Sequence, residues 1–314
     1  MNWLLRLPHW AQIAASEIRS RGVEGAGWAA VSLYRAMLVD RFPGTTFDRD
    51  GVRIFDRDWD LLIVLDACRA DLMGGVESEY PFVDGGAAYS AASTSKTWIE
   101  RNFDDRYSSE LAKTAYVTGN PFSEQLRSRT DIGFLDEVWR YAWDNERGTI
   151  PPRPLTDRLI SIGRQNEWER LIVHYMQPHF PALENPKLGG QIDINNAKSS
   201  NPDSIWRHLQ EGKVTSDEVW AAYETNLKSV LEDVELLLNN VDADTAVITS
   251  DHGNAIGDWG FYGHKEGIPL QCMRRVPWCE TNGTDSHEYV PQTYDRDDEV
   301  DTSVEERLSS LGYQ

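Results

Sequence analysis

The sequence has few cysteines and no long apolar run. Its three cysteines, Cys68, Cys272 and Cys279, form no CxxC pair, and three are too few for a disulfide framework. A reducing compartment is therefore the expected environment. No stretch of about 18 apolar residues occurs, which argues against a transmembrane helix. The opening MNWLLRLPHW shows neither the apolar core nor the cleavage site of a signal peptide, so we expect a cytoplasmic protein.

Basic residues are scarce, and lysine is the scarcer of the two. The 314 residues carry 51 Asp and Glu against 31 Lys and Arg, a formal net charge of -20, and only seven of the basic residues are lysines. A uniformly acidic surface repels nucleic acid and anionic membranes, so neither is an expected partner. Both an ordinary acidic enzyme and a protein from a high-salt cytoplasm fit this composition. The apolar fraction of 40% predicts a globular chain.

Four short apolar runs predict buried strands. They are DLLIVLD at 60–66, TAYVTGN at 114–120, RLIVHYMQ at 170–177 and TAVITSD at 245–251. Near-continuous β-branched and large apolar residues are typical of strands covered on both faces. Helical periodicity lies between the runs, most clearly over residues 217–240. Strands that alternate with helices predict an α/β fold with a mostly parallel central sheet and helices on both faces.

Differences in composition divide the chain into three regions. Residues 1–50 have the spacing of an amphipathic helical arm, which would pack on the domain or dock at a membrane surface. Residues 51–280 hold the four predicted strands and form the expected main domain. Within it, residues 181–216 are rich in Asn, Pro, Gly and Ser, which predicts a long loop. Residues 281–314 are acidic and polar and are expected to form a surface tail or a lid.

Candidate metal ligands follow three of the four predicted strands. Asp66 ends the first, Pro178-His179 follows the third, and Asp251 with His252 ends the fourth. A single Asp after a strand usually caps a helix or forms a turn. In an open α/β sheet, however, the carboxyl ends of the strands meet at one edge, where ligands bind. Asp and His together suit Zn²⁺ or Mn²⁺, whereas more carboxylate and water would suit Mg²⁺ or Ca²⁺.

A group of hydroxyl residues precedes a predicted helix. The helix is expected from Lys96 to Phe103. Directly before it stand Ser93, Thr94 and Ser95, and helix capping explains one of them. A hydroxyl at a helix N-terminus also faces backbone N–H groups and the positive end of the helix dipole, which stabilise a bound anion. A metal-coordinated hydroxyl can attack phosphorus, so capping and catalysis are compatible interpretations.

Together these motifs resemble the alkaline phosphatase and sulfatase superfamily, over roughly residues 55–280. LIVLDACRAD resembles the first-strand motif of that family, an apolar run followed by Asp, Arg and Asp. LIVHYMQPHFP resembles its HxxxPHxP motif, and TAVITSDHGNAIGDWGFYGHKEGIPLQCMRRVP resembles its SDHGE…GH…RVP stretch. STSKTWIERNF is also similar to sulfatase-like hydrolases of halophilic archaea. The resemblance implies an alkaline phosphatase-like catalytic domain over residues 51–280.

The resemblance further implies a metal centre with its nucleophile. Asp66, Asp251 and His252 would bind a divalent metal ion. The fourth ligand would be the nucleophile, which we place at Ser95, with Thr94 as the alternative. Ser95 is preferred because it is nearest to the helix that follows.

Four further residues would contact the substrate or support the site. His179 and His264 would lie on substrate oxygens as donors or general acids, or would bind a second metal ion. Arg69 would clamp an oxyanion or form a structural salt bridge, and Lys96 would offset charge in the transition state. His174, inside the third predicted strand, is expected to be a core residue or to support the site rather than to bind metal.

The sequence also departs from the family in ways that bear on the reaction. It lacks the Cys-x-Pro-Ser-Arg motif whose cysteine becomes formylglycine in sulfatases, and Cys68 stands elsewhere. A Ser or Thr nucleophile favours phosphate esters over sulfate esters. Asp66 is followed by Ala67 instead of a second Asp, and Pro178-His179-Phe180-Pro181 replaces the PDxxGH motif for a second ion. One metal ion is therefore favoured, as in lipoteichoic acid synthases and phosphoethanolamine transferases.

The implied activity is a metal-dependent phosphoester hydrolase that forms a covalent phospho-enzyme. A transferase that moves a phospho-group onto a glycan or lipid would use the same residues and would exclude water at the second step. A third alternative is a catalytically idle binding protein, whose sign would be an incomplete ligand set. Small-molecule, glycan or lipid-linked phosphoesters are the expected partners. The oligomeric state is left open.

Overall fold

The computed structural model describes most of the chain between residues 51 and 295. The described ranges are 51–129, 131–165, 168–186 and 204–295, with residue 188 and eight single positions nearer the two ends. Nearly all of the predicted arm at 1–50 and much of the predicted tail lie outside the described residues. Among the described helices, none combines the length and the apolar character needed to cross a membrane.

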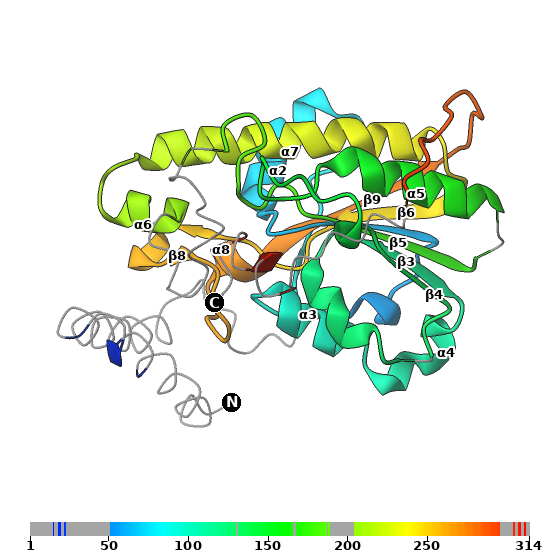
Figure 1. Ribbon diagram of the computed structural model, residues 1–314, viewed down its shortest axis with the longest axis horizontal. Coiled ribbons are helices and arrows are strands. Elements are labelled where there is room, and N and C mark those ends of the chain that lie inside the picture. Colours follow the sequence, from blue (N-terminus) through cyan, green and yellow to red (C-terminus); the bar gives the residue numbers. More distant parts are fainter. Residues whose placement is uncertain are drawn as a thin grey trace.

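A seven-stranded sheet forms the centre of the domain, in the order β2-β9-β6-β1-β5-β3-β4 (Figure 1). The strands β1, β3, β4, β5 and β6 are parallel, whereas β9 runs antiparallel to β6 and β2 antiparallel to β9. All four strands predicted from the sequence lie in the parallel part, which confirms a mostly parallel sheet. The strands are β1 Leu61–Leu65, β2 Ala87–Tyr89, β3 Thr114–Thr118, β4 Phe134–Glu137, β5 Arg170–Tyr175, β6 Ala243–Thr249 and β9 Arg275–Gly283.

Helices cover both faces of this sheet, as predicted. In Figure 1, α2, α5 and α7 lie on one side of the strands and α3 and α4 on the other. Side chains of β1 alternate between two hydrophobic clusters: Leu61, Ile63 and Leu65 pack on the α5 and α7 side, and Leu62 and Val64 on the α3 side. This is why the strand is apolar at every position. The helices are α2 Ala70–Val76, α3 Ser95–Asn102, α4 Ser108–Leu111, α5 Pro152–Gln165 and α7 Ser216–Leu238.

The longest helix, α7, follows directly from its sequence. Thr215 Oγ1 accepts a hydrogen bond from Glu218 N at 3.2 Å, and Glu218 Oε2 accepts one from Thr215 N at 2.8 Å. This reciprocal capping box defines the start of the helix. Val219, Tyr223 and Leu227 then recur at helical spacing and are buried against the sheet. The predicted range of 217–240 agrees with the observed one within two residues at either end.

Smaller elements extend the framework around the sheet. The hairpin β7–β8 follows β6, with a short 3-10 helix at its tip, and α6 packs beside β8. α6 lies inside residues 181–216, where the sequence predicted only a loop; it is short, capped by Ser204, and anchored by buried Ile205 and Leu209. These elements are α6 Ile205–Gln210, β7 Ala255–Ile256, β8 Tyr262–Gly263, α8 Gln271–Arg274, and the 3-10 helices Ile54–Asp56, Glu77–Glu79, Asp105–Tyr107, Pro121–Leu126, Val138–Arg140 and Asp258–Gly260.

The start of the predicted tail is attached to the domain. β9 ends at Gly283, beyond the expected boundary at residue 280. Asp285 then forms an ion pair with Arg164 of α5 at 2.7 Å. The hydroxyl groups of Tyr289 and Tyr294 donate to the two carboxylate oxygens of Asp157, also on α5, at 2.7 Å each. Residues 284–295 are therefore held against α5 by polar contacts.

Candidate functional site

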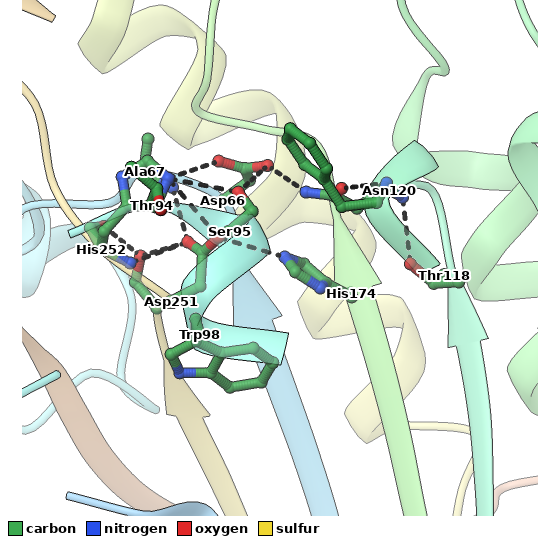
Figure 2. Close-up of polar contacts among 12 residues, drawn as sticks. Asp66, Ala67, Thr94, Ser95, Trp98, Thr118, Asn120, His174, Asp251 and His252 are labelled. Carbon is green, nitrogen blue, oxygen red and sulfur yellow. Dashed lines mark hydrogen bonds and ion pairs between the residues drawn. The ribbon is translucent and has the colours of Figure 1, made fainter. Parts of the chain in front are cut away.

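Four candidate residues converge at the carboxyl edge of the sheet. Asp66 directly follows β1, and Asp251 and His252 follow β6, the parallel neighbour of β1. Ser95 is the first residue of α3. All four side chains are fully buried, and Figure 2 shows them directed toward one another. The adjacency of β1 and β6 brings together two motifs that lie far apart in the sequence.

The distances between these side chains suit the ligands of one divalent cation. Asp66 Oδ1 and Asp251 Oδ2 each lie 3.6 Å from His252 Nε2. One ligand atom from each of Asp66, Asp251 and His252 falls within 4.8 Å of the others. Ser95 Oγ lies 3.4 Å from Asp66 Oδ2 and 3.2 Å from His252 Nε2. Two carboxylates, an imidazole and a hydroxyl form a donor set that suits Zn²⁺ or Mn²⁺.

The electrostatics of the centre also fit a cation. Oδ2 of Asp251 is buried, and no hydrogen bond reaches it from the part of the chain that the structure describes. An uncompensated buried carboxylate is costly. Burial raises the pKa of Asp251, but the nearby imidazoles of His252 and His174 outweigh that effect and hold the pKa well below its usual range. Asp251 is therefore ionised, as a metal ligand must be.

His252 is held in the tautomer that a metal ligand requires. Its Nδ1 lies 3.1 Å from the carbonyl oxygen of Gly253. A carbonyl only accepts hydrogen bonds, so Nδ1 carries the proton and the lone pair of Nε2 faces the space between Asp66 and Asp251 that a cation would occupy. Burial lowers the pKa of His252, which favours the neutral ring, and attraction to Asp251 partly opposes this effect.

The loops after β1 and β6 are joined by hydrogen bonds that orient the ligands. Asp251 Oδ1 accepts from Ala67 N at 3.0 Å and from His252 N at 2.8 Å. Ser250 Oγ accepts from Cys68 N at 2.8 Å and donates to the carbonyl of His252 at 2.6 Å. Ala67 has a φ of 62°, which costs an L-residue roughly 1–2 kcal/mol. Its two backbone groups are engaged, because its carbonyl also accepts from the Tyr223 hydroxyl.

Two residues that sequence reasoning did not place among the ligands complete the network. Asn120 follows β3, and its Nδ2 donates to Asp66 Oδ2 at 2.8 Å while its Oδ1 accepts from Phe122 N at 2.9 Å (Figure 2). His174 Nε2 lies 3.6 Å from Asp251 Oδ2, and its Nδ1 lies 2.9 Å from the hydroxyl of Tyr116. The available signal for Asn120 was its place at the end of the second apolar run.

The hydroxyl residues before α3 have separate contacts. Thr94 is the N-cap residue, and its side chain accepts from Thr97 N at 3.5 Å. Ser93 Oγ donates to the carbonyl of Lys265 at 2.9 Å. α3 begins at Ser95, one residue before the predicted start. Thr94 thus caps the helix, whereas the side chain of Ser95 lies beside Asp66 and His252.

His179 and His264 lie beside the centre, ring against ring. The centroid of His264 is 4.3 Å from that of His252 and 5.1 Å from that of His179. Burial lowers the pKa of His179 to about 4 and holds the pKa of His264 well below its usual range. His179 Nδ1 lies 2.5 Å from Phe180 O, and His264 Nδ1 lies 2.8 Å from Asn254 Oδ1. The lowered pKa values favour neutral rings, and the neighbouring oxygens favour a proton on Nδ1 in both.

Arg69 and Lys96 are placed differently from these residues. Arg69 is buried and forms ion pairs with Asp71 at 2.6 Å and Asp258 at 2.9 Å. Of the two alternatives for Arg69, this arrangement favours the structural salt bridge over the oxyanion clamp. Lys96 is exposed on the first turn of α3, and its ammonium forms no ion pair with the residues described.

No family model matches the chain, and no curated protein matches it. Three solved structures to which it is similar are the integral membrane lipooligosaccharide phosphoethanolamine transferase A of Neisseria meningitidis, the zinc complex of the C-terminal periplasmic domain of EptC from Escherichia coli, and a 2-O GAG sulfatase. In that order, identities are 14%, 12% and 14%, and TM-scores are 0.48, 0.42 and 0.43.

The extent of these similarities differs. The matches cover 90%, 85% and 71% of this chain, and 60%, 84% and 64% of the other chains. The chain thus spans about 60% of the length of the Neisseria transferase. With identities and TM-scores this low, these similarities carry no argument about this chain.

Proposed function

We propose that this protein is a metal-dependent phosphoester hydrolase of the alkaline phosphatase and sulfatase type, with Ser95 as its nucleophile. The observation that carries the proposal is the position of Ser95 Oγ, 3.4 Å from Asp66 Oδ2 and 3.2 Å from His252 Nε2, at the first residue of α3. A hydroxyl there lies both beside the ligands of a cation and at the positive end of a helix dipole.

The residues present would hold one divalent cation between Asp66, Asp251 and His252, with Ser95 beside it. Such a cation would lower the pKa of the Ser95 hydroxyl and offset charge on the phosphoryl oxygens. Zn²⁺ and Mn²⁺ suit this donor set best. Asn120 and His174 hold the two carboxylates in position from outside the ligand set.

The first chemical step assigned to the chain is an in-line attack by Ser95. As the bond between Ser95 Oγ and phosphorus forms, the bond from phosphorus to the leaving oxygen breaks, and the proton lost by Ser95 is balanced by one gained by that oxygen, which gives a phosphoseryl enzyme and a free alcohol. Backbone N–H groups at the start of α3 face the phosphoryl oxygens and stabilise their charge. Water then attacks phosphorus, the bond between phosphorus and Ser95 Oγ breaks, and the phosphate leaves while Ser95 regains its proton.

His179 and His264 suit the second step as proton acceptors. The sequence-based expectation was that they donate protons, but the contacts of Nδ1 with Phe180 O and Asn254 Oδ1 make Nε2 the accepting atom in both rings. A neutral imidazole with a lowered pKa can take a proton from the water that attacks the seryl phosphate. An acceptor alcohol in place of water would make the same enzyme a transferase.

A matched pair of variants tests the nucleophile. Ser95→Ala should lower turnover of an aryl phosphate by about 10⁴-fold or more and leave metal content intact. Thr94→Ala should lose less than about 10-fold, because Thr94 contributes only a helix cap worth about 1 kcal/mol. Mass spectrometry of the quenched reaction should find phosphate on Ser95. Full activity in Ser95→Ala with none in Thr94→Ala would assign the role to Thr94.

A substrate panel separates the remaining alternatives. Purified protein would be analysed for bound metal and assayed with phosphomonoesters, phosphodiesters and sulfate esters at low and high salt. Hydrolysis of phosphate esters supports the proposal, and a product that forms only with an added alcohol acceptor indicates a transferase. Sulfate ester hydrolysis alone would contradict phosphoryl chemistry. Absence of both metal and turnover would favour an idle binding protein.

A further inference from the structure

Arg69 lies at the junction of two loops of the site. Its Nε and Nη2 donate to the two carboxylate oxygens of Asp71 at 2.8 and 2.6 Å. Its Nη1 donates to Asp258 Oδ2 at 2.9 Å and to the carbonyl of Asn254 at 3.1 Å. The ring of Trp220 packs on the guanidinium, with Cζ 5.1 Å from the ring centroid. With four of its five N–H groups engaged, Arg69 is arranged to hold protein groups.

Both contacts from Nη1 reach the segment that connects the two histidines of the motif. Asn254 and Asp258 lie between His252 and His264, at the two ends of the first strand of the β7–β8 hairpin. Asp258 Oδ2 also accepts from Ile256 N at 2.8 Å. The carboxylate that holds Arg69 is thus itself fixed to the hairpin backbone, so the guanidinium ties the hairpin to the loop after β1.

Asn254 carries this connection to His264. Its side chain is fully buried, and its Oδ1 lies 2.8 Å from His264 Nδ1. An amide oxygen only accepts, so it requires the proton of His264 on Nδ1. The main chain of Asn254 is held by Arg69, and its side chain orients the His264 ring. A shift of the guanidinium would therefore shift the ring.

We propose that Arg69 and Asn254 are positioning residues that hold His264 with Nε2 as a proton acceptor at the metal centre. The catalytic consequence rests on the proposed function, whereas the tautomer of His264 is a property of the fold. The two motifs DACRAD and DHGNAIGD then form one unit. Asp66 and His252 supply ligands, and Arg69 with Asp258 fixes the geometry between them.

The tautomer provides a direct test without turnover. Long-range proton–nitrogen NMR of the metal-free full chain, with His264→Gln to assign the signal, should show wild-type His264 protonated at Nδ1. In Asn254→Ala, the His264 ring should become a mixture of the two tautomers. In Asn254→Asp, the side chain still accepts a hydrogen bond from Nδ1, so the Nδ1-protonated tautomer should be restored. A wild-type ring protonated at Nε2, or an unchanged ring in Asn254→Ala, would overturn the proposal.

The role of Arg69 is tested through its partner on the hairpin. Asp258→Ala removes one ion pair and should move the His264 nitrogen signals in the same direction as Asn254→Ala. Asp258→Asn is the second variant if the alanine protein does not fold. The matched control is Asp233→Asn, which weakens a remote ion pair with Arg153 of 2.6 Å and should leave the His264 signals in place. Equal shifts in Asp258 and Asp233 variants would show a general loss of structure and contradict the proposal.

Kinetics then separate positioning from general stability. In the aryl phosphate assay, Asp258→Ala should lower kcat by about 10- to 100-fold with little change in KM. In a His264→Gln background it should have little further effect, because the two substitutions act through the same ring. Fully additive losses would contradict positioning. If wild-type protein has no phosphatase activity, the proposed function fails while the NMR result still decides the positioning of His264.

Discussion

β1 carries an aspartate at each end, and the two lie in opposite environments. Asp60, before the strand, is exposed, and its Oδ2 accepts a hydrogen bond from Thr245 N at 2.8 Å. Asp66, after the strand, is fully buried with His252 3.6 Å away. Five apolar residues separate the two carboxylates. Whether an aspartate is exposed to water or buried among candidate ligands therefore depends on the edge of the sheet at which it lies, and not on the residue type.

β6 repeats the same contrast. Asp242 and Asp244, at its amino end, are exposed, and Asp242 accepts from Asp285 N at 2.9 Å. Asp251, at its carboxyl end, is buried among Asp66 and two imidazoles. A cluster of buried carboxylates and histidines is unfavourable for the stability of the metal-free fold. The buried aspartate at the carboxyl edge therefore lowers the stability of the metal-free fold, whereas the exposed aspartates at the amino edge do not. Such a loss of stability is common at functional sites.

The largest expected effect comes from the same substitution at the two ends of β1. Asp66→Asn should lower kcat/KM for an aryl phosphate on the order of 10³-fold, because it removes a charged ligand from the centre. Asp60→Asn should change it by less than about twofold, since that residue bonds only a backbone N–H at the surface. Steady-state assays with both proteins check this. Comparable losses in the two would mean that the contrast between the edges does not reflect function.

Acid should weaken the carboxyl edge selectively. Burial lowers the pKa of His179 to about 4 from the usual 6.5. Between these two pH values, His179 is protonated in the unfolded chain and neutral in the folded one. Stability is therefore full above about pH 6.5 and falls as the pH drops toward 4, by about 3 kcal/mol at most from this residue. Urea unfolding of the metal-free protein at several pH values measures the loss. His179→Asn should flatten that pH dependence; an unchanged slope in this variant would refute the assignment.

Metal binding should stabilise one edge and leave the other unaffected. At a Zn²⁺ or Mn²⁺ concentration about 100 times its Kd, the free energy of unfolding should rise by about 2.7 kcal/mol. Asp60→Asn should keep this gain and Asp66→Asn should lose it. Without metal, Asp66→Asn should match or exceed the wild-type Tm, because one of two close carboxylates is gone. Thermal unfolding with and without a chelator tests both statements. A wild-type Tm that does not change when metal is added would count against the proposed metal site.

The smallest expected effect concerns two alanines. Ala67 has a left-handed φ of 62° at the carboxyl edge, so Ala67→Gly should relieve strain and change stability by between about 0 and +1 kcal/mol. Ala243, at the amino end of β6, lies in extended strand, and Ala243→Gly should destabilise by roughly 0.5–1 kcal/mol. Denaturant unfolding compares the two. Equal losses would show that the turn after Asp66 is not strained.

The strands and the ligand set were accessible to sequence reasoning because each depends on local pattern. Runs such as LLIVL are apolar throughout, and only a strand covered on both faces requires that. Asp66 and Asp251 stood out because they end such runs. Asn120 ends the run of β3 in the same way, but an asparagine there is ordinary in turns. Its contact with Asp66 depends on the sheet order, with β5 between β3 and β1.

The choice between Ser95 and Thr94 needed the helix start to within one residue. Sequence patterns place helix ends only to within one or two residues, and here the difference moves the cap from one hydroxyl to the next. The role of Arg69 could not be predicted from local sequence patterns either. Its charge is evident in the sequence, but its partners Asp258 and Asn254 lie almost two hundred residues away. The cytoplasmic location and the high-salt origin stay predictions.

The sequence by itself determined the alternation of buried strands and helices, the acidic character, and the residue types able to hold a cation. These follow from short-range apolar periodicity and composition, which act within one element at a time. Only the tertiary structure decided which polar residues meet, which hydroxyl caps α3, and which acceptor lies beside Nδ1 of His264. Those properties depend on the pairing of β1 with β6 and on side chains from separate loops, and no local pattern encodes their mutual distances.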